Sequence, residues 1–129
     1  EVVAPGSEVA LKVSVHFYED AEQPHFSCFV RDERGQTVYD QTTLWQGAKT
    51  PSFKKGQQVV VCYYLQVNLV EGIYQIGADL HYQDLTCYYD RVESLASLIV
   101  KGGDRAKGIA DLRCRVSFHD PVKRGLIPV

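Results

Sequence analysis

Several features that would point to a functional class are missing from this sequence of 129 residues. No apolar run approaches the roughly 20 residues that cross a bilayer. The net charge is −2, and the aromatic residues are not interleaved with Lys or Arg, so no nucleic-acid partner is expected. The sequence also has no phosphate-binding loop and no nucleophile elbow of the G-x-S-x-G type. We therefore expect no cofactor.

Cysteine and histidine are sparse and scattered. The four cysteines lie more than twenty residues apart, which excludes local metal knuckles and C-x-x-C redox pairs. Small disulfide domains are denser in cysteine, so free thiols and a reducing compartment are expected. The four histidines include no pair at metal-ligand spacing, so no metal site is expected. Nothing selects two of Asp79, Asp84 and Asp90 as the carboxylate couple that glycoside hydrolysis requires, and no enzyme is predicted.

Alternation of apolar and polar residues with a period of two is the main pattern that the sequence does contain. This pattern indicates half-buried strands, and residues 8–18 show it most strictly. About eight short strands separated by turn signals indicate one antiparallel sandwich or barrel. The predicted strands are 8–18, 24–32, 36–45, 58–67, 73–83, 86–91, 95–101 and 111–119.

A tyrosine follows the turn before the strand at 73–83. In immunoglobulin-like sandwiches a tyrosine at this corner bonds back to upstream backbone, and Gly72 with Tyr74 fits that arrangement. The immunoglobulin disulfide is missing, because Ile76 stands where the second cysteine would be. The sequence therefore predicts an all-β, immunoglobulin-like antiparallel sandwich of about eight strands without that disulfide.

The strand at 73–83 also supplies the candidate site. Its inner face would carry Tyr74, Ile76, Ala78, Leu80 and Tyr82, and its outer face would carry Gln75, Gly77, Asp79 and His81, with Gly77 leaving a shallow notch. Aromatic rings can carry the apolar face of a sugar, while amides, carboxylates and imidazoles bond hydroxyls. The candidate carbohydrate-binding residues are Tyr39, Trp45, Gln75, Asp79, His81 and Tyr89. The alternative is an ordinary solvated sheet face.

Three stretches taken together resemble a known family. They are "GSEVALKVSVHFYEDAEQPHFSCFVRDERGQTVYDQTT" (6–43), "GQQVVVCYYLQVNLVEGIYQIGADLHY" (56–82) and "YYDRVESLASLIVKG" (88–102). In order and spacing they resemble the C-terminal domain of Wzt-type ATP-binding proteins of O-antigen polysaccharide ABC transporters. The resemblance implies a non-catalytic β-sandwich that binds bacterial O-polysaccharide, with its modified non-reducing end as the expected feature recognised.

The resemblance also implies partners and a location. Expected partners are a second copy of the chain, the nucleotide-binding domain of the same parent chain and the transporter membrane subunit. The expected location is cytoplasmic, at the inner face of the inner membrane. Within a single domain spanning 1–129, the sandwich would occupy 6–102. A hinge, a final strand exchanged in a dimer and a tail would follow at 103–129.

Two other functions stay open on the sequence. One is an immunoglobulin-like adhesion or spacer domain that binds protein, and the other is an enzyme accessory domain or a fragment of a glycoside hydrolase. The nature of the sugar cap is also open on the sequence. Arg31 and Arg91 are candidates for binding an acidic cap, and they are equally well explained as ordinary surface charges.

Overall fold

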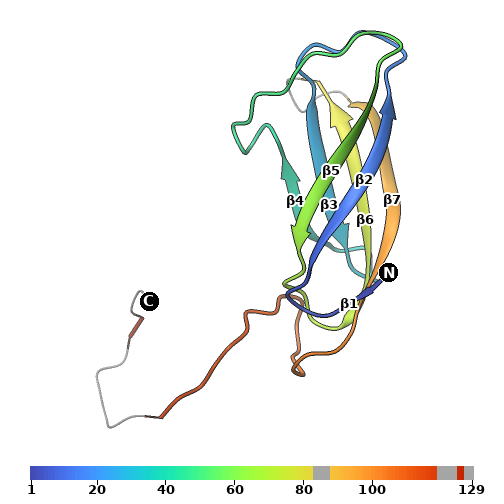
Figure 1. Cartoon of the computed structure of the whole chain (residues 1–129). Helices are drawn as coiled ribbons and strands as arrows, with labels where there is room; N and C mark the ends of the chain where they lie inside the picture. The colour runs from blue at the N-terminus through green and yellow to red at the C-terminus, as the bar shows by residue number, and fades with distance from the viewer. Residues whose placement is uncertain (83–87, 119–124, 127–129) are drawn as a thin grey trace.

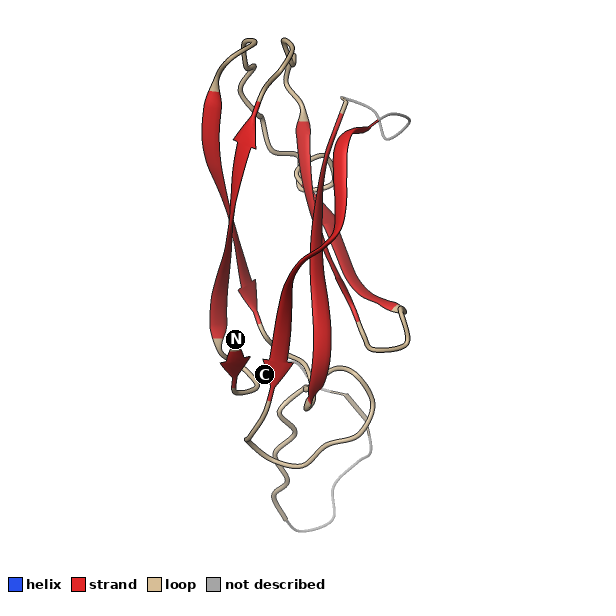
Figure 2. Ribbon diagram, turned by 90° about the vertical axis from the view of Figure 1, so that its right-hand side faces the viewer, coloured by secondary structure: helices blue, strands red, loops and turns tan. Residues whose placement is uncertain are grey.

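The computed structural model describes residues 1–82, 88–118 and 125–126 and shows a sandwich of two β-sheets (Figures 1 and 2). The larger sheet has the strand order β1-β7-β6-β3-β4, and the smaller sheet consists of β2 and β5. The strands are β1 (Val2–Val3), β2 (Glu8–His16), β3 (His25–Arg31), β4 (Thr37–Thr42), β5 (Gln58–Gln66), β6 (Gly72–His81) and β7 (Tyr88–Val100). The all-β sandwich predicted from alternation is thus confirmed.

All strand pairs are antiparallel except β1 with β7, which is a short parallel pair that the sequence did not predict. The segments 86–91 and 95–101, predicted as separate strands, belong largely to the single strand β7; residues 86 and 87 lie outside the described residues. The register of β7 against β6 jumps from Ile76↔Ala96 to Ala78↔Val92, which leaves residues 93–95 as a bulge opposite Gly77.

Two apolar clusters hold the layers together. The first joins Cys28 and Val30 of β3 to Ile76 of β6, with Leu11 of β2 and Leu65 of β5 packed against them. The second surrounds Phe17, Phe26, Phe53 and Leu80 at the other end of the sandwich, where the Phe17 and Phe53 rings stack 4.4 Å apart. Their members from the strands lie on the inner faces that alternation assigns, and Phe53 comes from the loop between β4 and β5. Burial of these side chains is the main stabilising contribution.

The tyrosine corner forms as predicted. The Tyr74 hydroxyl donates a hydrogen bond of 2.8 Å to the carbonyl oxygen of Val70, four residues upstream, and the side chain is buried. This bond fixes the turn through which the chain passes from the small sheet into the large one. Among the described cysteines, Cys28, Cys62 and Cys114 are free, as expected; Cys87 lies outside the described residues.

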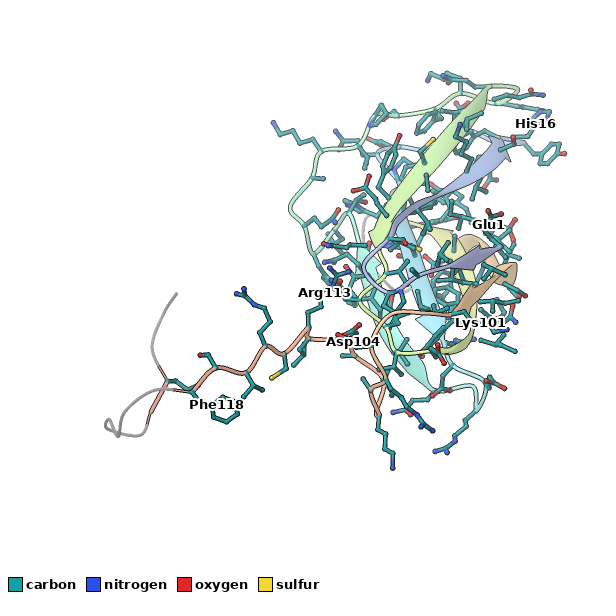
Figure 3. The ribbon with its side chains drawn as sticks, turned by 60° about the horizontal axis from the view of Figure 1, so that its bottom comes forward. Glu1, His16, Lys101, Asp104, Arg113 and Phe118 are labelled. Carbon is teal, nitrogen blue, oxygen red and sulfur yellow. The ribbon has the colours of Figure 1, made fainter. Side chains whose placement is uncertain are left out.

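The segment at 111–118 is not part of a sheet in the single chain, although its alternation predicted a strand. The backbone at 109–111 docks on residues 68–70, and the Arg113 side chain donates to the Pro5 carbonyl oxygen. Beyond Arg113 the chain runs away from the sandwich as an extended arm, residues 114–118, with Phe118 far from both sheets (Figures 1 and 3). The predicted residue 119 lies outside the described residues.

Candidate functional site

The outer face of β6 is covered, which corrects the prediction of a wet sugar-binding platform there. The side chain of His81 is fully buried and Asp79 is 7% exposed. The reason is that β6 is the middle strand of five, so that outer-face side chains of β3 and β7 fold over it. The notch expected at Gly77 is filled by the Phe29 ring: a Cβ at residue 77 would lie 2.3 Å from that ring.

Asp79 belongs to a network of charges over the Phe29 ring. Its carboxylate accepts a hydrogen bond of 2.9 Å from Arg91, and Glu93 accepts from both Arg91 and Arg31. The two guanidinium groups lie 4.4 Å (Arg91) and 4.9 Å (Arg31) from the centre of the Phe29 ring. Burial raises the pKa of Asp79 above its ordinary value, against the opposing effects of the Ser27 hydrogen bond and the charges of His81 and Arg91.

The raised pKa of Asp79 predicts a pH dependence of stability. Because the folded state binds the Asp79 proton more tightly than the unfolded chain, its contribution to stability grows as the pH falls toward the ordinary value of 3.8 and shrinks as the pH rises. The wild-type chain should therefore gain stability relative to Asp79→Asn between pH 7 and pH 4. Urea unfolding of both proteins at several pH values measures the free energy of unfolding of the wild type minus that of Asp79→Asn. A value that stays constant or falls between pH 7 and pH 4 would contradict the prediction.

His81 is also held in a polar network inside the fold. Its Nε2 lies 2.9 Å from the Thr42 hydroxyl, and its Nδ1 lies 2.8 Å from the Tyr82 carbonyl oxygen. Its ring stacks with that of His25, and burial together with the charge of His81 lowers the pKa of His25. These contacts give His81 a structural role in joining β6 to β3 and β4.

The remaining candidates Gln75, Tyr39 and Trp45 do not gather at one place. Gln75 accepts hydrogen bonds from Ser94 and Ser97 of β7, at 2.7 and 2.9 Å. Tyr39 pairs with Val30, whose side chain lies in the core, so Tyr39 projects from the inner side of the edge strand β4. Trp45 is 59% exposed in the turn after β4. The structure therefore does not bring these three residues together with Asp79 and His81.

The sixth candidate, Tyr89, lines a cleft that opens between the two sheets. The cleft has a volume of about 540 Å³ and lies between β2 and the first half of β7. It exists because the two-stranded sheet is too narrow to cover the inner face of the larger sheet, so the side next to β2 stays open. Apolar side chains that line it are Val13, Val15, Phe17, Phe26, Tyr63, Leu80, Tyr89, Val92 and Leu95.

Polar and charged side chains also line this cleft. Ser14, His16, Glu19 and Asp90 are exposed, whereas Asp79 and Arg91 are paired with each other. The His16 ring stacks on that of Tyr18 with 4.5 Å between centres. Burial raises the pKa of Tyr89, and its ring packs on Tyr82 at 4.1 Å. An apolar interior with hydrogen-bonding groups at the rim is the usual composition of a small-ligand site.

The geometry defines the class of protein. It is a two-layer β-sandwich with an open cleft between its sheets, and the described residues include no group of side chains that could hold a metal ion. Residues 1–112 match the family model described as "Wzt C-terminal domain", and the chain belongs to this family. The family is the carbohydrate-binding C-terminal region of an O-antigen transporter protein and is separate from the ATPase domain, so this domain binds polysaccharide and is not catalytic.

A solved structure is similar in fold. The crystal structure of the C-terminal domain of Wzt superposes with a TM-score of 0.82 at 17% identity, covering 91% of this chain and 73% of that chain. A search of curated proteins gave no match. No helix in the described part of the chain is long and apolar enough to span a membrane. The resemblance seen in the sequence is thereby confirmed for family and fold.

Proposed function

We propose that this domain binds the exported O-polysaccharide by its non-reducing end, and that the end enters the cleft between β2 and β7. The observation that carries the proposal is the cleft itself. Its apolar walls come from the inner faces of both sheets and include Phe26 and Leu80 of the core. Its volume of about 540 Å³ is in the range of small-ligand sites, so it suits a single chain end better than a continuing chain.

The chemistry of the cleft suits a sugar. The half-buried Tyr89 lines the cavity, and sugars place their C–H faces on such rings. Ser14, Glu19 and Asp90 at the rim offer partners for hydroxyl groups. Of the residues predicted from the sequence, Tyr89 keeps a proposed contact role. Asp79 also lines the cleft, with its carboxylate paired to Arg91, whereas Tyr39, Trp45, Gln75 and His81 are not among the lining residues.

Titration with matched polysaccharides tests the proposal. Chains of the exported O-polysaccharide with an intact non-reducing end should bind with a dissociation constant on the order of micromolar to millimolar, because a small open site gains little beyond the cost of association. Internal fragments of the same repeat, which lack that end, should bind at least about tenfold more weakly. Equal affinity for both would show that the end is not recognised.

We also propose that the chain forms a homodimer by exchange of residues 111–118. In the single chain the apolar face of this segment is uncovered, with Leu112, Val116 and Phe118 at 87%, 75% and 91% exposure. The small sheet meanwhile has two strands, so β2 and β5 each have one unpaired edge in the described structure. Pairing of the segment with such an edge on a second copy would cover its apolar face and give the backbone groups of the edge hydrogen-bond partners, as in other exchanged dimers.

Truncation after Arg113 tests the exchange while keeping the contacts of residues 109–113 with the sandwich. The full chain is expected to be a dimer by light scattering and the truncated chain a monomer, because the unpaired edges then have no exchanged strand. A truncated chain that stays dimeric would show that the interface lies elsewhere.

The family also suggests the partners and the location of this domain. We propose that the domain is joined to the nucleotide-binding domain of the same chain and works with the membrane subunit of the transporter. In that arrangement it meets the finished polysaccharide at the cytoplasmic face of the inner membrane.

A further inference from the structure

Resting on the proposed exchange, we infer that the arm fits the free edge of β5 in one register, and that Arg113 keeps the arm from closing on its own chain. The β5 edge of a second copy is then its binding site. Two independent observations lead to this inference: the strand pairing at the base of the arm, and the conformation and contacts of Arg113.

The base of the arm already pairs with the chain just beyond β5. Leu69 and Ala110 form an antiparallel bridge, and the amide of Asp111 donates to the carbonyl oxygen of Asn68 at 2.9 Å. β5 ends at Gln66, shortly before this bridge. An antiparallel ladder that continued from the bridge in the same register would therefore run along β5.

That register places every apolar residue of the arm and its base on the inner face of the small sheet. Opposite residues of a ladder lie on the same face. The pairs would be Leu112 with Val67, Cys114 with Leu65, Val116 with Tyr63 and Phe118 with Val61. The four partners belong to the two apolar clusters or pack against them. A shift of one residue would turn the apolar side chains of the arm outward, so the register is strongly specified.

The backbone of β5 presents its free groups at matching positions. The amide of Val67 donates to the carbonyl oxygen of Ser7 at 2.7 Å, so residue 67 bonds toward β2. Because the bonding direction alternates along an antiparallel strand, Gln66, Tyr64 and Cys62 direct their amide and carbonyl groups to the other edge. An arm at this edge would leave the cleft beside β2 open to the polysaccharide.

Arg113 turns the chain away from this edge. Its φ is 53°, in the left-handed region that residues other than glycine rarely adopt. Nη2 of its guanidinium donates to the Pro5 carbonyl oxygen at 2.9 Å and fills the space beside Gly6, where even a Cβ would overlap it. A strand along β5 needs an extended residue 113. The Arg113–Pro5 contact therefore directs the arm away from its own sandwich, as Figures 1 and 3 show.

Loss of this contact is expected to replace exchange by closure of the arm on its own chain. In Arg113→Ala, residue 113 is free to become extended and the arm can pair with its own β5. The dissociation constant of the dimer should rise at least about tenfold, as expected for loss of a hydrogen bond from a charged group. Light scattering over a range of concentrations measures it. Arg115→Ala, which removes the same charge further along the arm, should dimerise as the wild type does.

A cross-link identifies the edge and the register. Position 117 would lie opposite Cys62, at a Cα separation of about 5.5 Å that a disulfide can span. In a full chain with Cys87→Ser, Cys114→Ser and Ser117→Cys, the remaining thiol, Cys28, is buried. Oxidation of this chain should link position 117 to Cys62 of a second copy. Addition of Arg113→Ala should instead give a monomer with the same link inside one chain.

Three results would overturn the inference. Arg113→Ala might dimerise as tightly as the wild type, the wild-type dimer might not link position 117 to Cys62, or the Arg113→Ala monomer might lack the internal link. A dimer that persists after truncation behind Arg113 would instead contradict the exchange itself, and the polysaccharide titration does not depend on either outcome.

Discussion

Replacing Gly77 by alanine is expected to destabilise the domain by about 3 kcal/mol, the upper range for overpacking a core. The added Cβ would lie 2.3 Å from Cε2 of Phe29 and 2.6 Å from the backbone carbonyl oxygen of Glu93. Neither neighbour can move easily: the Phe29 ring is 1% exposed with two guanidinium groups packed on it, and the carbonyl belongs to the strand β7. Urea unfolding gives the free energy of unfolding for both proteins.

Gly35→Ala is the matched control for this prediction. A Cβ at Gly35 would meet nothing within 4 Å, and only the positive φ of 79° opposes it. The cost there should be about 1 kcal/mol. A loss at Gly77 no larger than the loss at Gly35 would mean that the Phe29 ring does not fill the face of β6.

Leu95→Glu is expected to weaken polysaccharide binding by at least about a hundredfold. The substitution places a further carboxylate in a cleft that Asp90 also lines, and it removes the apolar surface against which the sugar end would lie. Since each tenfold change in affinity corresponds to about 1.4 kcal/mol, the loss is about 2.7 kcal/mol or more. Leu95 is partly exposed and lies in a bulge, so the fold should survive the change. Calorimetric titration with the polysaccharide measures the effect.

Val60→Glu is the matched control for Leu95→Glu. Val60 is also exposed, at 59%, and also changes from an aliphatic side chain to glutamate, but it lies on β5 outside the cleft lining. It should leave the affinity unchanged. If both variants lost affinity equally, the effect would come from net charge and the cleft would lose its support as the binding site.

The inner faces of the strands could be predicted from the sequence because alternation carries the information directly. Of the five residues predicted for the inner face of β6, Tyr74, Ile76, Ala78 and Leu80 are buried, whereas Tyr82, beyond the end of the strand, is 41% exposed. The Tyr74 hydroxyl donates to the Val70 carbonyl as the corner motif predicts. A half-buried strand has a period of two whatever its neighbours are, so these positions do not depend on strand order.

The outer face could not be predicted in the same way. Alternation places Asp79 and His81 opposite the core, but whether they meet water depends on what adjacent strands place over them. Phe29 on β3 and Arg91 on β7 cover this face, and both pairings are long-range. The presence of glycine at 77 was a visible signal, since a strand interior often has glycine where another group approaches closely.

The cleft depends on the order and number of strands, which the sequence does not state. It requires that one sheet has two strands and the other five, and that β2 lies across from β7. One local signal was available: within 88–100, Val92 and Leu95 are three residues apart and break the alternation, as residues of a bulge do. Tyr89 was identified through its ring, although on a different surface.

The most direct test of the central claim is an NMR titration of the methyl-labelled chain with the end-intact O-polysaccharide. If the chain end enters the inter-sheet cleft, the methyl signals of Leu80, Val92 and Leu95 should shift together at saturation, while that of Val60 on the outside of the small sheet stays in place. Binding with no change at Leu80, Val92 and Leu95 would place the polysaccharide elsewhere on the molecule and contradict the account.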